Sequence, residues 1–412
     1  MKNQTNQNQM QKKFCPIVRK LLLGIFLFCT ACESSQTDND SLKILDITDL
    51  SKTEVVKASD IDVVDIEYIS LETDTNSLIS FIRNIKSDDN FLYIRTSDGL
   101  LRFDLNGKFI SKIGKKGRGP QEYQILMDYS IGADGNIYIL SLFQEKIFIY
   151  TPKGDFVRTI PAPFTTYYIE CFEDGILCYS LDLSGSMEKN IHALDYSGNI
   201  LKEFSNKYLI ADRLEQQDTM PPPPPPNFGL IPLFRNEDKL FLKEFYSDTV
   251  FLFNQTDLVF EPAFILDRGG RLITLEAEIS GSESRRAEYI EDTKIIQFGD
   301  KVYAEFIDRA AEYSKYGFYA SFDKSRQYLM SIDEHGIIND IDGGPSIWMK
   351  TPLNRNTVIS WIDAFELIAF VNSDEFKNST PKYPEKKKEL EKLAKSLDEN
   401  DNPILMLVRF KE

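Results

Sequence analysis

The stretch best suited to chemistry runs from 111 to 126 and reads SKIGKKGRGPQEYQIL. It combines Gly114, Gly117 and Gly119 with four basic side chains, and glycine-rich loops can cradle phosphate groups through their backbone N–H groups. The glycine spacing, however, does not match the dinucleotide-binding fingerprint, and no helix follows that could receive a phosphate. We therefore interpret this stretch as a connection between two strands.

Other catalytic groups are sparse. Neither of the two histidines, His192 and His335, has a second His or a Cys at metal-ligand spacing. The sequence contains no G-x-S-x-G elbow and no Walker motif, although its 64 acidic residues offer carboxylate pairs for glycosidase-type chemistry. The Asp-rich turns at 87–90 and 340–344 carry oxygen ligands suited to calcium, but such turns also form without an ion. We predict no cofactor, with calcium as the alternative.

Two cysteines in the body of the chain, Cys171 and Cys178, flank a candidate hairpin turn at Asp174–Gly175. A two-residue turn there places Cys171 opposite Cys178, with Cα atoms about 4.5–5.5 Å apart, which is within disulfide range. An exported compartment would permit that bond. Two buried free thiols are the alternative.

The N-terminus has the features of an export signal. Residues 1–31 contain basic but no acidic side chains, and the apolar run at 21–28 is shorter than the roughly 20 residues of a membrane-spanning helix. Thr30 and Ala31 before Cys32 are typical of a lipobox, in which Cys32 becomes the lipid-modified mature N-terminus. A plain secretory signal is the alternative. We assign 1–31 to the signal peptide and the polar stretch 32–50 to a flexible tether.

The rest of the chain, 51–412, is dominated by repeated hairpins. Alternating strand–turn–strand segments recur at 80–96, 100–114, 128–142, 146–160, 191–205, 250–266 and 328–341. Four strands repeated at roughly 45 to 60 residues are typical of β-propeller blades. Unpaired strands remain at 65–72 and 402–411, and two more are expected in 358–371, so the chain ends can close a sixth blade together. We predict an all-β, six-bladed β-propeller, with seven blades as the alternative.

Three segments do not follow the strand pattern. The proline run 221–226 is expected to form an extended polyproline II spacer, and 271–293 a partly helical insertion. The segment 384–400 is an amphipathic helix, which we expect to pack on the last blade.

Two of these motifs, GKKGRGPQEY after the first blade and the terminal ENDNPILMLVRFK, resemble those of six-bladed β-propeller lipoproteins of Bacteroides-type gut bacteria. The lipobox and the repeated FDLNGKFISKIG-type units strengthen this resemblance, which covers most of residues 40–412. Gln121 departs from the glycine usual in that family. The resemblance implies an NHL-like or TolB-like propeller in the cell envelope, often associated with nutrient uptake. It transfers no catalytic residues.

In a propeller, the glycine-rich stretch must cross from the rim of one blade to the innermost strand of the next. We therefore expect Arg118, Glu122 and Tyr123 near the mouth of the central channel, as candidate ligand contacts. The alternative is an Arg118–Glu122 contact that pins the loop.

The net charge of −16 makes nucleic acid a poor partner. Because no nucleophile is recognisable, we favour a binding or scaffold module over an enzyme. We expect it to be lipid-anchored to the outer membrane, on its periplasmic or outer face. Its partners would be an uptake protein and a glycan or peptide ligand. The alternative is a propeller hydrolase or lyase that uses Asp, Glu, Tyr and Arg side chains around the channel.

Overall fold

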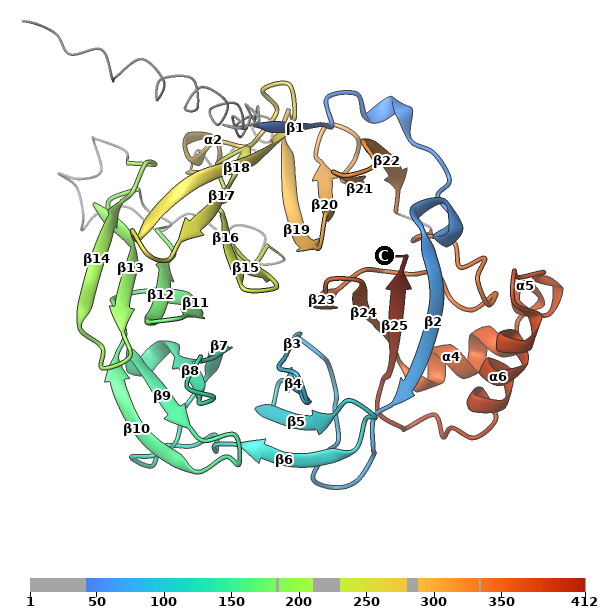
Figure 1. The fold of residues 1–412 in the computed structure, drawn as a ribbon, viewed down its shortest axis with the longest axis horizontal. Helices are drawn as coiled ribbons and strands as arrows, with labels where there is room; N and C mark the ends of the chain where they lie inside the picture. Colours follow the sequence, from blue (N-terminus) through green and yellow to red (C-terminus); the bar gives the residue numbers. More distant parts are fainter. Residues whose placement is uncertain (1–41, 183–184, 210–229, 280–287, 333–334, 412) are drawn as a thin grey trace, which may run out of the picture. The chain divides into compact units, whose positions relative to one another are not determined.

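The computed structural model describes residues 42–182, 185–209, 230–279, 288–332 and 335–411. Their strands form six antiparallel sheets arranged as blades around a common axis (Figure 1). This confirms the predicted six-bladed β-propeller.

The first three blades each consist of four strands in chain order, beginning with the innermost. They are β3 (Asn84–Ser87), β4 (Phe91–Arg95), β5 (Leu100–Asp104) and β6 (Phe109–Ile113); β7 (Leu126–Ile131), β8 (Ile137–Ser141), β9 (Lys146–Tyr150) and β10 (Phe156–Pro161); and β11 (Thr166–Phe172), β12 (Gly175–Ser180), β13 (Lys189–Asp195) and β14 (Ile200–Ser205).

The fourth and fifth blades repeat the same order. They are β15 (Leu233–Asn236), β16 (Lys239–Lys243), β17 (Thr249–Asn254) and β18 (Val259–Asp267); and β19 (Ile290–Phe298), β20 (Lys301–Asp308), β21 (Ser314–Ser321) and β22 (Arg326–Ser331). The expected hairpin at 328–341 is wrong, because β22 pairs with β21 before it, and the segment after it forms only isolated bridges, one of them between Ile337 and Ile347.

The sixth blade joins the two ends of the chain, as predicted. Its order is β23 (Thr351–Asn354), β24 (Thr357–Ile362), β25 (Ile404–Phe410) and β2 (Val63–Ser70), with β2 outermost. Two strands were expected within 358–371, but only β24 lies there. The second half of that segment forms the helix α4 (Ala364–Asn372), which follows Asp363 and in which buried Ala364, Leu367 and Val371 recur with helical spacing.

The segment before β2 crosses the rim of three blades. Strand β1 (Lys43–Asp46) pairs in parallel with β18 of the fourth blade, so the flexible tether predicted for 32–50 is wrong from residue 43 onward. The short turns η1 (Leu50–Lys52) and η2 (Ala58–Ile61) follow, and Glu54 N donates to Leu329 O of the fifth blade. We call residues 43–61 the N-terminal strap; it leads directly into β2.

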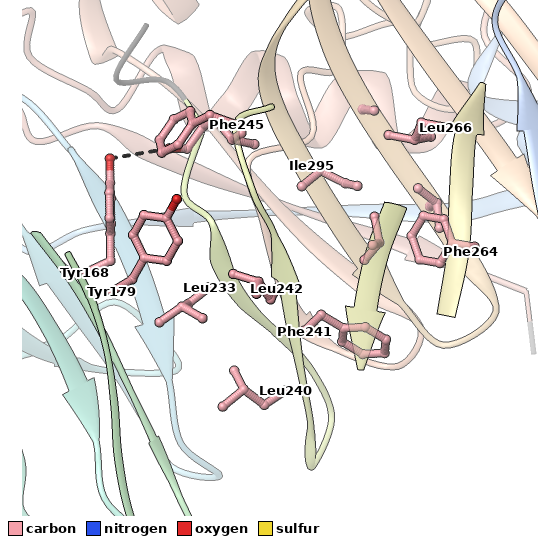
Figure 2. Close-up of a cluster of buried hydrophobic side chains, with 14 of the residues drawn as sticks. Tyr168, Tyr179, Leu233, Leu240, Phe241, Leu242, Phe245, Phe264, Leu266 and Ile295 are labelled. Atoms are coloured by element: carbon pink, nitrogen blue, oxygen red, sulfur yellow. Dashed lines mark hydrogen bonds between the residues drawn. The ribbon is translucent and has the colours of Figure 1, made fainter. Parts of the chain in front are cut away.

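Between neighbouring blades, apolar side chains from facing sheets form the core. Figure 2 shows one such cluster, to which the third, fourth and fifth blades contribute Tyr179, Phe241 and Ile295, respectively. Fully burying a side chain of this size contributes about 1.5–3 kcal/mol, so these inter-blade clusters supply much of the stability of the ring.

Few helices accompany the strands. Helix α5 (Asp374–Asn378) and helix α6 (Pro384–Ala394) follow α4. Leu390 and Ala394 of α6 belong to a buried cluster that includes Ile404 of the sixth blade, so the helix predicted within 384–400 packs on the last blade, and it contacts α4 as well. Within 271–293, α2 (Leu275–Ile279) is helical and β19 begins at 290. η3 (Leu142–Gln144) is a single turn.

In the part of the chain that is described, no helix is long and apolar enough to span a membrane. The proline run 221–226, the predicted signal peptide 1–31 and the predicted lipidation site Cys32 lie outside the described residues.

Candidate functional site

Charged side chains meet at the axis of the propeller, on the innermost strands of the first four blades. Glu170 of β11 is their common acceptor: Lys86 Nζ of β3 lies 2.6 Å from its Oε2, and Arg235 Nε of β15 lies 2.6 Å from its Oε1. Ser130 Oγ of β7 donates to the same Oε1 at 2.9 Å, and Asp128 Oδ1 lies 3.9 Å from Lys86 Nζ. We call these five residues the axial cluster.

Backbone groups of the inner strands fix the two cations. Lys86 Nζ donates to Tyr129 O at 2.6 Å, and the backbone N–H of Lys86 donates to the hydroxyl of Tyr129 at 2.8 Å. The Arg235 guanidinium also donates to the carbonyl oxygen of Cys171. Each cation is therefore held by at least two acceptors, which orders its head group before any ligand arrives.

Burial within the axial cluster divides the charges by sign. The side chains of Glu170 and Asp128 are each 4% exposed, whereas those of Lys86 and Arg235 are 20% and 35% exposed. The cations therefore face solvent near the axis, and the carboxyl groups lie behind them.

The pKa shifts agree with this arrangement. Burial opposes the ionisation of Glu170, but Lys86 and Arg235 outweigh it and lower the pKa of that carboxyl group. Burial also opposes the charge of Lys86, yet Asp128 and Glu170 raise its pKa overall. Burial raises the pKa of Asp128 despite Lys86 and Arg95. The cluster therefore keeps its cations charged over the physiological pH range, with Glu170 ionised between them.

Two of the three residues predicted from the glycine-rich stretch, Glu122 and Tyr123, have structural roles instead. Glu122 Oε2 accepts from the backbone N–H of Gly119 at 2.9 Å, and Lys115 Nζ lies 2.9 Å from Glu122 Oε1. A Cβ atom on Gly117 would lie 2.0 Å from the Glu122 carboxylate, so a larger residue there would displace that carboxylate from its present position. Glu122 does pin the loop, but its cationic partner is Lys115. The Arg118 side chain is exposed and has no hydrogen bond or ion pair with any described residue.

Tyr123 does not reach a channel mouth, and that prediction is wrong. It is buried in the cluster between the first and second blades, where its ring lies edge-on to Tyr150 at 6.3 Å. Its hydroxyl lies 3.5 Å from the carbonyl oxygen of Ile113, on the outermost strand of the first blade. Tyr123 therefore anchors the crossing loop between two blades.

The predicted opposition of the two cysteines is also wrong. The two-residue turn consists of Glu173 and Asp174, because Phe172 pairs with Gly175. The register then places Cys171 opposite Ile176, and Cys178 opposite Ile169. Both thiols are buried and free, and burial raises the pKa of Cys171 to about 12. This is the alternative state considered for them.

In each Asp-rich turn, one carboxylate accepts hydrogen bonds from protein groups: Asp88 in the first and Asp340 in the second. Asp88 accepts from the backbone N–H groups of Asn90 and Phe91, and Asp340 accepts from Ser59. Among the residues that the structure describes, no group of three or more His, Cys, Asp and Glu side chains is placed to hold a metal ion. The side chain of His192 on β13 faces Glu203, and burial lowers its pKa.

Residues 42–409 match a family described as a domain of unknown function, DUF4934. The chain belongs to the DUF4934 family. The match begins beside β1 and ends within β25, so the domain includes the N-terminal strap. No curated protein matches the chain.

Two solved structures extend the comparison of this DUF4934 domain. A Bacteroides fragilis protein named "putative exported protein" is 18% identical, with a TM-score of 0.68 over 90% of this chain and 100% of its own. A DUF4221 member from Bacteroides vulgatus is 11% identical, with a TM-score of 0.48 over 85% of this chain and 97% of its own. At such identity, the first likeness supports the six-bladed fold of this DUF4934 chain.

Proposed function

We propose that this DUF4934 chain is an exported binding protein whose axial cluster receives an acidic group of a glycan or peptide. The observation that carries the proposal is the division of charge by burial. Lys86 and Arg235 face solvent, while Glu170, which orders them, is almost fully buried. A ligand that approaches the axis therefore meets positive charge, although the whole chain is strongly acidic.

Arginine suits this role. A guanidinium group has five N–H donors, and Arg235 directs only part of them to Glu170 and to the carbonyl oxygen of Cys171. The remaining donors can bind a ligand carboxylate, and Lys86 adds a second charge nearby. Because protein acceptors already order both side chains, binding costs less conformational entropy than it would with free surface lysines.

The axial cluster offers little to catalysis. Glu170 is ionised but already accepts from three side chains, Asp128 is buried, and the Ser130 hydroxyl, which donates to Glu170, is fully buried and so not accessible to a substrate. These features support binding over the hydrolase or lyase alternative.

The wider context of the proposal is the cell envelope. The sequence N-terminal to the domain has the form of a lipoprotein signal, and an exported Bacteroides protein shares the fold. We propose that Cys32 carries the lipid anchor and that the propeller presents its ligand to an uptake protein at the outer membrane. Mass spectrometry of the mature N-terminus tests the anchor, and an unmodified Cys32 would refute it.

The binding proposal is tested with the secreted form of the chain. Arrays of acidic and neutral glycans and peptides identify a ligand, and calorimetry then measures its affinity for the wild type and for Arg235→Gln. We expect the substitution to weaken binding at least tenfold, about 1.4 kcal/mol. Arg118→Gln is the matched control, because it removes an exposed arginine that has no side-chain partner among the described residues.

Two outcomes would count against the binding proposal. Equal affinity of Arg235→Gln and wild type would remove the axial cluster as the site. Turnover of the ligand, abolished by Glu170→Gln, would replace binding with catalysis.

A further inference from the structure

A second site lies on the rim, between the sixth blade and helix α6. A cleft of about 560 Å³ is bounded there by β2, β25 and α6, and Asp342 lines it as well. Its apolar lining consists of Ile66, Leu390 and Leu393. In Figure 1, α6 lies outside β2, on the opposite side of that strand from the axis. The cleft is therefore separate from the axial cluster.

Asp342 is the unusual group in this cleft. The residue is only 1% exposed, and its Oδ1 accepts three hydrogen bonds: from Asn339 Nδ2 at 2.6 Å, from Gly344 N at 2.8 Å and from the hydroxyl of Tyr68 at 3.3 Å. Its Oδ2 is buried and has no partner among the described residues. Leaving a buried carboxylate oxygen unpaired costs free energy, so this atom calls for a donor.

The loop holds Asp342 rigidly in place. A Cβ atom on Gly344 would lie 2.3 Å from the hydroxyl of Tyr68 and 2.8 Å from Asp342 Oδ1, so the glycine lets the three groups approach closely. Asn339 Oδ1 in turn accepts from the backbone N–H of Asp342 at 3.3 Å. The unpaired oxygen is therefore part of an ordered turn.

The rim of the cleft is also acidic. Its two cations are already paired, Lys386 with Asp65, and Arg409 with Asp65 and Glu67. The third rim carboxylate, Glu389, has no ion pair with any described residue. Together with Asp342, the cleft has four carboxyl groups against two basic groups, which favours a cationic ligand.

We infer that this cleft binds a primary ammonium group on an apolar stem, as in the lysine side chain of a peptide. The ammonium group supplies the hydrogen-bond donor that Asp342 Oδ2 lacks and the positive partner that Glu389 lacks. The methylene stem lies along Leu390 and Leu393. A compact ammonium with three N–H donors fits such a narrow acidic site better than a planar guanidinium group does.

The test uses the secreted chain and three probes. Gly-Lys-Gly carries the ammonium on a peptide, Gly-norleucine-Gly keeps the stem without the charge, and butane-1,4-diamine carries the charge without a peptide. Calorimetry or NMR titration should show saturable binding of Gly-Lys-Gly and at least tenfold weaker binding of the norleucine peptide. Similar binding of the diamine would identify free amines as ligands, and weaker binding would identify peptides; both results support the ammonium site.

Variants locate the site. Asp342→Asn keeps the shape of the side chain and should weaken binding of Gly-Lys-Gly at least tenfold. Glu389→Gln, on the exposed face of α6, should weaken it a few-fold without disturbing the fold. Glu391→Gln on the same helix lies outside the cleft lining and serves as the matched control.

The inference would be overturned by equal affinity for the lysine and norleucine peptides, or by unchanged binding in Glu389→Gln together with Asp342→Asn. If Asp342→Asn does not fold, Glu389→Gln alone decides. Arg235→Gln should leave this binding unchanged, so the axial cluster and the cleft are tested independently.

Discussion

A buried group of ion pairs between the fourth and fifth blades should make the stability of the fold sensitive to the loss of a single charge. Asp292 of β19 accepts from Lys243 Nζ of β16 at 2.6 Å and forms an ion pair with Arg268, which follows β18. Both cationic side chains are fully buried, and Asp292 is nearly so. Burial opposes the ionisation of Asp292, but Arg268 and Lys243 outweigh it and lower its pKa. Arg268 also forms an ion pair with Asp248, whereas Asp292 is the carboxylate that pairs with Lys243 among the described residues.

Asp292→Asn removes that charge while keeping the size of the side chain. Removing one partner of a buried ion pair costs about 3–5 kcal/mol, because the remaining charge, here that of Lys243, stays buried without its carboxylate partner. The unit from Leu42 to Glu412 has about 370 residues, for which the entropy of unfolding is about 0.8 kcal/mol per degree. We therefore expect the Tm to fall by about 4–6 °C.

Thermal unfolding followed by circular dichroism measures this shift. Glu391→Gln is the control, because it removes the same charge from an ion pair with Lys395 whose side chains are 45% and 72% exposed. Exposed pairs of this kind contribute at most about 1 kcal/mol, so the control should shift the Tm by about 1 °C or less. Equal shifts in the two variants would refute the reasoning that Asp292 holds the two blades together.

Three further predictions concern pH, thiols and the crossing loop. The pKa values of Asp292 and Glu170 are lowered, so these residues stabilise the fold fully above the ordinary carboxyl pKa, and this stabilisation is lost as the pH falls through the lowered values. The wild-type Tm should therefore drop in acid more steeply than that of Asp292→Asn. Cys171, buried and with its pKa raised to about 12, should not react with Ellman's reagent until the protein is unfolded in urea; prompt reaction in the native state would contradict its burial. Glu122→Gln should lower the Tm, because it weakens the hydrogen bond to Gly119 and removes the ion pair with Lys115, whereas Arg118→Ala should leave the Tm unchanged in the same melting experiment.

The repeats were predictable because they are local. Period-two alternation and turn glycines such as Gly107 and Gly154 specify each hairpin within about 15 residues, and both glycines have positive φ in the structure. Short apolar runs gave less certain results, because the segment after Trp361 fits a strand as well as the helix that α4 forms.

Register and long-range contacts were not predictable in the same way. The observed turn, Glu173–Asp174, lies one residue before the predicted Asp174–Gly175, and this shift changed every residue pair in the hairpin. The sequence did not distinguish the two turns, because both contain polar residues. The axial cluster draws Lys86, Glu170 and Arg235 from three different repeats. Its only sequence signal is a charged residue within a short apolar inner strand, which becomes meaningful only when the ring closes.

The N-terminal strap gives the domain a particular response to force. A pull on the N-terminal side of the domain acts first on β1, whose parallel ladder with β18 spans only the four residues from Lys43 to Asp46. The longer ladder between β2 and β25, which closes the ring, is loaded only after β1 has detached and the hydrogen bonds of the strap to Leu329, Ile338 and Asp340 have broken. The strap can therefore detach and extend under tension while the six blades and the axial cluster stay intact.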